Sequence, residues 1–73
     1  MNLRVTYHAG ERFLQRVFDV SSYTMQEVKN AMRLISKDIK DVQHNCLSFP
    51  LPSFPSHRAI VKNGALVTII AKH

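Results

Sequence analysis

The dipeptide Asn63-Gly64 constrains the fold of this chain more than any other short stretch of its sequence. It separates two apolar runs, and both central positions of a type I′ turn need a positive φ, which asparagine and glycine tolerate well. We therefore expect a β-hairpin centred on this dipeptide. Counting outward from the turn pairs Lys62 with Ala65, Ile60 with Val67 and Ala59 with Thr68.

Alternation along the two predicted strands divides their side chains between two faces. One face receives His57, Ala59, Val61, Leu66, Thr68, Ile70 and Lys72. The other receives Arg58, Ile60, Lys62, Ala65, Val67, Ile69 and Ala71. Because both sets are largely apolar, we expect the last strand to be central in its sheet.

The first forty residues predict one strand and two helices. Residues 2–7 alternate between apolar and polar side chains, as a short strand with one buried face does. An amphipathic pattern from about Ala9 to Phe18 predicts the first helix. The second begins with a capping box formed by Thr24 and Glu27. A 3-4 apolar repeat then predicts its buried stripe: Met25, Val28, Met32, Ile35 and Ile39.

A further strand is predicted over residues 42–49. Three prolines follow and predict that residues 50–55 form a rigid extended loop without regular structure, from which Leu51 and Phe54 pack onto the core. The resulting order is strand, helix, helix, strand, strand, strand. It predicts one α+β domain over residues 1–73, with both N-terminal helices on one face of a mostly antiparallel sheet.

Length and composition predict a small globular protein of the cytoplasm. A chain of 73 residues buries a limited core, so a homodimer or another partner would supplement it. No apolar run is long enough to span a membrane, and the single cysteine, Cys46, cannot form an internal disulfide. Ten Lys and Arg against five Asp and Glu give a net charge of +5, which favours polyanionic partners.

The polar side of the first predicted helix carries residues suited to phosphodiester chemistry. His8, Arg12 and Arg16 lie four residues apart and stack along one ridge, with Glu11 and Gln15 on the same arc. An ordinary amphipathic helix has the same pattern, and Asp19 is placed to hold Arg16 in an ion pair. On the second helix, Lys29, Arg33, Lys37 and Lys40 form a basic row that is either a nucleic-acid contact or a solvated face.

The sequence does not predict a metal site or a cofactor. Its four histidines, His8, His44, His57 and His73, show no ligand spacing, and no HExxH or CxxC motif occurs. Glycine-rich phosphate loops are also absent from the sequence. The chemistry that remains is metal-independent acid–base cleavage of RNA, whose 2′-hydroxyl is an internal nucleophile.

In such a reaction His8 and His57 would serve as general base and acid. Cationic side chains would bind the phosphate: Arg12, Arg16, Arg58 and Lys72. Thr68 would donate a hydrogen bond. Each of these residues also has an ordinary interpretation, since Thr68 is typical of a strand and Arg58 and Lys72 are typical solvated strand charges.

The opening and the end of the chain resemble a small uncharacterised bacterial and phage family. The opening has the form T-x-H-A-x-x-R-x-x-x-R, carried here by Thr6, His8, Ala9, Arg12 and Arg16, and the matching residues at the end are Arg58, Gly64, Leu66, Val67 and Thr68. That family is similar to the RelE and BrnT toxins of the barnase–RelE-like ribonucleases. The resemblance implies a RelE-like fold, with His8, Arg12, Arg58 and Thr68 as site residues. The linker at 17–23 is longer than in the family and lacks glycine.

Two functions of different classes are therefore expected. The first is a metal-independent endoribonuclease or RNA-binding protein, such as a toxin neutralised by an acidic antitoxin. The second is a non-catalytic phage or prophage protein that binds and modulates a host protein. A DNA-binding regulator is disfavoured because no helix–turn–helix with a glycine turn is visible.

Overall fold

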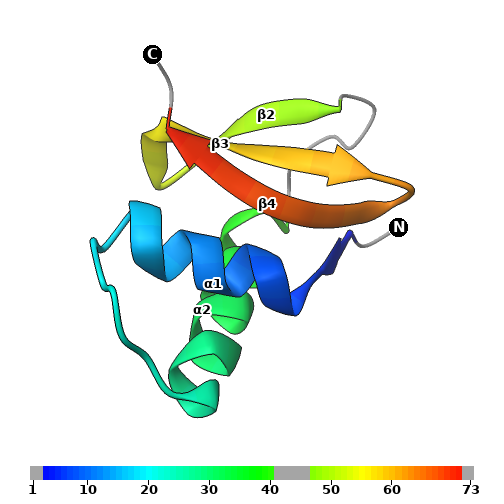
Figure 1. Ribbon diagram of the computed structural model, residues 1–73. Coiled ribbons are helices and arrows are strands. Elements are labelled where there is room, and N and C mark those ends of the chain that lie inside the picture. Colours follow the sequence, from blue (N-terminus) through cyan, green and yellow to red (C-terminus); the bar gives the residue numbers. More distant parts are fainter. Residues whose placement is uncertain (1–2, 41–46, 72–73) are drawn as a thin grey trace.

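Two helices lie against one face of a four-stranded sheet in the computed structural model, which describes residues 3–40 and 47–71 (Figure 1). The elements are β1 (Arg4–Val5), α1 (Tyr7–Arg16), α2 (Met25–Asp38), β2 (Ser48–Leu51), β3 (Phe54–Lys62) and β4 (Ala65–Ala71). The strand order is β1-β4-β3-β2. β1 pairs parallel to β4 and the other two pairings are antiparallel, so the sheet is mixed. The predicted α+β class, the element order and the central last strand are confirmed.

Thr6 attaches the start of α1 to the central strand. Its hydroxyl accepts a hydrogen bond from the Ala9 amide at 3.2 Å, as an N-cap does, and donates one to the Leu66 carbonyl at 3.0 Å. The Thr6 amide donates to the same carbonyl at 3.1 Å. The helix therefore begins at Tyr7, slightly before its predicted start, and ends at Arg16.

The predicted capping box of α2 is confirmed. The Glu27 amide donates to the Thr24 hydroxyl at 3.2 Å, and the Glu27 carboxylate accepts from the Thr24 amide at 3.0 Å. Of the predicted apolar stripe, Val28, Ile35 and Ile39 are buried and Met32 is partly buried against the core. Met25 is 62% exposed, so the stripe was predicted one turn too long at its start. The first turn of α2 lies away from the sheet (Figure 1), and the residue that it packs against α1 is Val28 rather than Met25.

The hairpin turn has the predicted backbone, with φ of 53° at Asn63 and 76° at Gly64. The predicted register is wrong beyond the first pairs. Lys62 faces Ala65 as expected, but the register shifts between Ile60 and Val61, so that the pairs become Ile60 with Thr68, Ala59 with Ile69, Arg58 with Ile70 and His57 with Ala71. This bulge has a physical cause: it lets Leu66 and Ile69, three residues apart, both reach full burial.

The bulge also corrects the predicted faces of the sheet. Residues paired directly across two strands share a face. Because Ala59 and Ile69 are buried in the main core, Thr68 and Ile70 project from the opposite, outer face with their partners Ile60 and Arg58. Thr68 therefore does not share a face with His57 or Ala59.

The predicted loop over residues 50–55 is wrong as well. Pro50 and Leu51 belong to β2, and Phe54 and Pro55 begin β3. β2 is an edge strand, where a missing amide donor is tolerated, and Pro55 falls where the register between β2 and β3 shifts. Leu51 is fully buried and Phe54 packs on the core, as predicted. Most of the strand predicted at 42–49 lies outside the described residues; its last two residues, 48 and 49, are in β2.

Candidate nucleic-acid interface

Five polar side chains form a closed ring of interactions on the exposed side of α1. Arg12 Nε donates to His8 Nε2 at 3.2 Å, and Arg12 Nη1 donates to Gln15 Oε1 at 2.9 Å. Gln15 Nε2 donates to the Tyr23 hydroxyl at 2.8 Å, and that hydroxyl donates to Glu11 Oε2 at 3.0 Å. The other Glu11 oxygen lies 3.7 Å from His8 Nδ1, which closes the ring.

The ring restricts what His8 and Arg12 can do. Because a guanidinium has only donors, the Arg12–His8 hydrogen bond requires an unprotonated Nε2 on His8. That lone pair is the one a general base would offer to a substrate, and here Arg12 occupies it. Arg12 in turn commits two of its five N–H donors within the ring. The first two positions of the predicted ridge are therefore held together as a structural unit.

The complete ring could not be predicted from the sequence. Glu11 and Gln15 could be placed on the arc of His8 by helical spacing, and the structure confirms that they share it. Tyr23 lies in the linker before α2, and no spacing rule predicts that its hydroxyl reaches α1. The ring thereby joins the linker to the exposed side of α1.

The environment of Tyr23 supports a prediction about pH. Partial burial is the largest cause that raises the pKa of Tyr23 above its ordinary value of 10.0, and the hydrogen bond to the Glu11 carboxylate is the second. A raised pKa means that folding favours the neutral phenol. Its contribution to stability is then complete below pH 10.0 and is lost as the pH rises through the folded-state pKa.

We expect Tyr23→Phe to be less stable than the wild type at pH 7, and we expect this difference to shrink above pH 10.0. Urea denaturation from pH 7 to pH 11 measures both effects. Tyr7→Phe is the matched control, because Tyr7 is 42% exposed and its hydroxyl has no hydrogen-bond partner among the described residues. A difference that widened above pH 10.0 would contradict the assignment.

His57 lies at the opposite end of α1 from His8. His57 Nε2 donates to the Arg16 carbonyl at 2.9 Å, and its Nδ1 lies 3.1 Å from the Ser56 hydroxyl. His8 and Arg16 are eight residues apart, which is about 12 Å along a helix. A general acid and base must both reach one phosphodiester within hydrogen-bond distance. The structure does not bring the predicted pair together.

Arg58 and Thr68 lie elsewhere again, on the outer face of the sheet. Arg58 Nη2 donates to the Ser48 hydroxyl at 3.2 Å. The five predicted catalytic residues are thus distributed over the exposed side of α1, the C-terminal end of α1 and the far side of the sheet. Lys72 lies outside the described residues, as do His44, Cys46 and His73.

The basic residues of α2 have no comparable side-chain partners among the described residues. Lys29, Arg33 and Lys37 are exposed, recur about every 6 Å along the helix, and have no acidic partner within residues 3–40 and 47–71. Like charges four residues apart each cost a helix about 0.2–0.5 kcal/mol. Arg16 is also exposed, and the predicted ion pair with Asp19 does not form in the described part of the chain.

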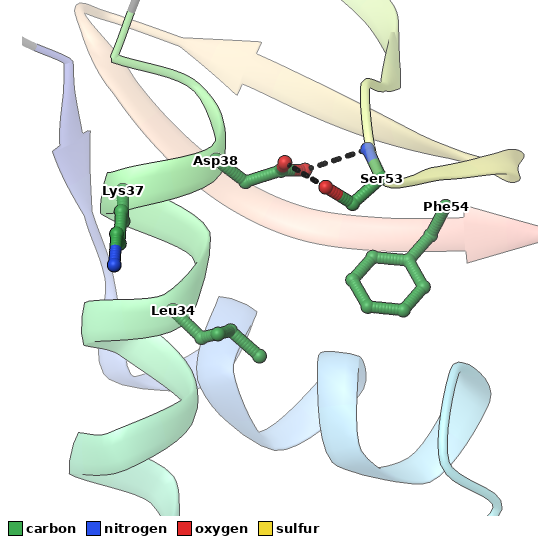
Figure 2. A pocket seen from close by; sticks show the side chains of 5 residues that line it. All are labelled: Leu34, Lys37, Asp38, Ser53 and Phe54. Atoms are coloured by element: carbon green, nitrogen blue, oxygen red, sulfur yellow. Dashed lines mark hydrogen bonds between the residues drawn. The ribbon is translucent and has the colours of Figure 1, made fainter.

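Both carboxylates of α2 form hydrogen bonds of their own. Glu27 caps the start of α2 through the Thr24 amide. Asp38 accepts hydrogen bonds from both the amide and the hydroxyl of Ser53, as Figure 2 shows. In the same view the Lys37 ammonium points away from Asp38. Among the described residues, the free charge along this side of α2 is therefore positive.

Two further properties of the described residues bear on possible partners. Among them, no three His, Cys, Asp or Glu side chains gather in a way that could hold a metal ion. No helix in that part of the chain has the length and apolar character needed to cross a membrane.

No family model matches the chain, and neither a curated protein nor a solved structure matches it. The likeness to the RelE and BrnT toxins therefore rests on the sequence motif alone. A functional assignment has to come from the geometry of the side chains.

Proposed function

We propose that this protein binds RNA through the exposed cations of α2, and that binding rather than cleavage is its principal activity. The observation that carries the proposal is the row of Lys29, Arg33 and Lys37. Three like charges on successive turns destabilise a helix unless a polyanion neutralises them. A nucleic-acid backbone presents negative charges at regular intervals. When such a row of cations binds it, counterions condensed on the phosphates are released, and this release favours binding.

The separation of the histidines favours binding over catalysis. His8 offers its lone pair to Arg12, and His57 donates to a backbone carbonyl at the other end of α1. Arg58 and Thr68 face away from both. A RelE-like ribonuclease that used these residues on one phosphate would need a rearrangement of the ring and of the hairpin.

Two double variants with equal charge change test the proposal. We expect Arg33→Gln/Lys37→Gln to bind a labelled RNA oligomer roughly tenfold more weakly than the wild type at about 0.1 M salt. The slope of log affinity against log salt should also fall in magnitude by about 1.4, from about 0.7 for each lost phosphate contact. Arg4→Gln/Lys62→Gln removes one arginine and one lysine from exposed positions on the sheet and should keep most of the affinity.

Equal loss in both double variants would mean that net charge alone attracts RNA, and would contradict a defined interface. If the wild type did not bind RNA, the proposal would be wrong. The alternative, an acidic antitoxin or host protein held by the same row, would then become the leading function. In the binding assay, run with EDTA, we expect the RNA to stay intact because His8 and His57, the predicted acid and base, lie at opposite ends of α1.

A further inference from the structure

A groove lined by aromatic and aliphatic side chains runs along α2 beside the basic row. Its first hollow, about 400 Å³, is lined by Leu34, Lys37, Asp38, Ser53 and Phe54 (Figure 2). The second, about 340 Å³, is lined by Phe13, Leu14, Phe18, Glu27, Asn30, Ala31 and Leu34. Leu34, which is 44% exposed, lines both hollows, and the two neighbouring hollows are together called here the aromatic groove.

Three phenylalanine rings form a rigid wall of this groove. Phe13, Phe18 and Phe54 pack edge to face in all three pairs, with ring centroids 5.3, 5.4 and 5.8 Å apart and interplanar angles of 77°, 79° and 76°. Phe13 is buried, whereas Phe18 stays 49% exposed. A ring held by two others and still half exposed is a preorganised surface for a planar ligand.

Charge is distributed unevenly across the groove. Arg33 precedes Leu34 by one residue and so lies about 100° around the helix from it, on the side where Lys29 and Lys37 also lie. Lys37, from the basic row, lines the first hollow, and the other charged groups of the groove are the carboxylates of Glu27 and Asp38. The amide of Asn30 lies in the second hollow. Cations thus run along one side of an apolar depression whose remaining charged groups are acidic.

We propose that this surface selects single-stranded RNA, with the backbone along the basic row and an unpaired base in the aromatic groove against Phe18 and Phe54. The inference rests on the proposed function and names its substrate class. A single strand has the matching asymmetry, with phosphates on one side and uncharged bases on the other. Cations beside aromatic rings are the usual means of binding such strands. In a duplex the bases are paired and stacked, so they cannot enter the groove.

The same asymmetry disfavours an acidic helix as the occupant. Such a helix carries carboxylates on both flanks of its apolar face, and one flank would meet Glu27 and Asp38 without a free cation opposite. The exocyclic amino groups of bases, in contrast, donate hydrogen bonds to carboxylates and amides.

The test compares Phe18→Leu with the wild type on three RNAs: a single strand, a duplex of equal length, and the single strand with 2-aminopurine at its centre. Leucine keeps the apolar contact with Phe13 and Phe54 but removes the ring. We expect the wild type to prefer the single strand, and Phe18→Leu to bind it at least about fivefold more weakly. Affinity for the duplex should not change. Fluorescence of 2-aminopurine should be quenched by the wild type and not by the variant.

The outcomes separate this inference from the proposed function. Equal binding of strand and duplex, with no effect of Phe18→Leu, would overturn the base-binding groove and leave the basic row in place. Failure of the wild type to bind any of the RNAs would overturn both. If the wild type sediments as a dimer and Phe18→Leu sediments as a monomer, the groove is the contact surface for a second copy of the chain. This result would overturn its assignment as a base site. An unchanged thermal unfolding midpoint shows that Phe18→Leu is folded.

Discussion

Replacing Phe13 by alanine is expected to lower the free energy of unfolding by about 3–5 kcal/mol, the cost of removing a buried aromatic side chain. Phe13 is 1% exposed, belongs to the main core and contacts both other rings of the aromatic wall. Its loss leaves a cavity between α1, α2 and the sheet. In a domain this small the effect is comparable with the whole stability, so we expect little folded protein at 37 °C.

Phe18→Ala is the matched control for this prediction. It removes the same side chain from the same wall, but half of Phe18 is already in water, so the expected loss is about 1 kcal/mol. Chemical denaturation followed by circular dichroism measures both variants. Phe13→Leu keeps most of the side-chain volume and should remain folded. Its free energy of unfolding can therefore be measured even if Phe13→Ala does not fold. Equal losses at positions 13 and 18 would contradict the placement of Phe13 in the core.

The second large effect is expected at Gly10, where the backbone of α1 lies against Val28 and Met32 of α2. A Cβ at this position would lie 2.8 Å from Met32 Cγ and 3.0 Å from both Val28 Cγ1 and the Val28 carbonyl oxygen. Alanine favours a helix over glycine by about 1 kcal/mol, but the carbonyl belongs to the backbone of α2 and cannot move alone. We expect Gly10→Ala to destabilise the fold by a net of about 2 kcal/mol.

A double-mutant cycle with Met32→Ala tests the cause of this loss. Met32 is only partly buried, so Met32→Ala should fold, and it removes the closest of the three contacts. If the collision between the helices is responsible, Gly10→Ala should cost clearly less in the Met32→Ala background. A stabilising Gly10→Ala would show that helix propensity outweighs packing here and that the helices can separate without loss.

These packing effects matter for the proposed interface because both sides of it depend on α2. Gly10 lets α2 lie against α1, and Phe13 supports the rings beside Leu34. The cations of α2 point to solvent only while its other side is buried against α1 and the sheet. A variant that loosened the helix pair would therefore weaken RNA binding indirectly. The unfolding midpoint of each variant should therefore be measured together with its affinity for RNA.

The candidate site was only partly accessible to sequence reasoning. Lys29, Arg33 and Lys37 were recognised because a four-residue spacing places them on one side of any helix. The placement of Thr68 on the same face as His57 was wrong, because it assumed strict alternation through the hairpin. Phe18 and Phe54 were read separately, one at the end of a helix and the other in a loop. Nothing local indicated that their rings meet across 36 residues.

By itself, the sequence determined the features whose partners lie within a few residues. The capping box joins Thr24 to Glu27, and the turn at Asn63-Gly64 depends on two φ angles. Only the tertiary structure decided the features whose partners are distant. Thr6 meets Leu66 across 60 residues, and His57 meets the Arg16 carbonyl across 41.

The same distinction between local and distant partners explains the bulge in the hairpin and the proline in the edge strand. Burial of both Leu66 and Ile69 under the helices outweighed the regular alternation that the sequence predicts for β4. Pro50 was accepted in β2 because that strand lies at the edge of the sheet, a position no local pattern reveals. Local hydrogen bonds and dihedral preferences act before the chain is compact, whereas burial and strand position exist only once the layers have assembled.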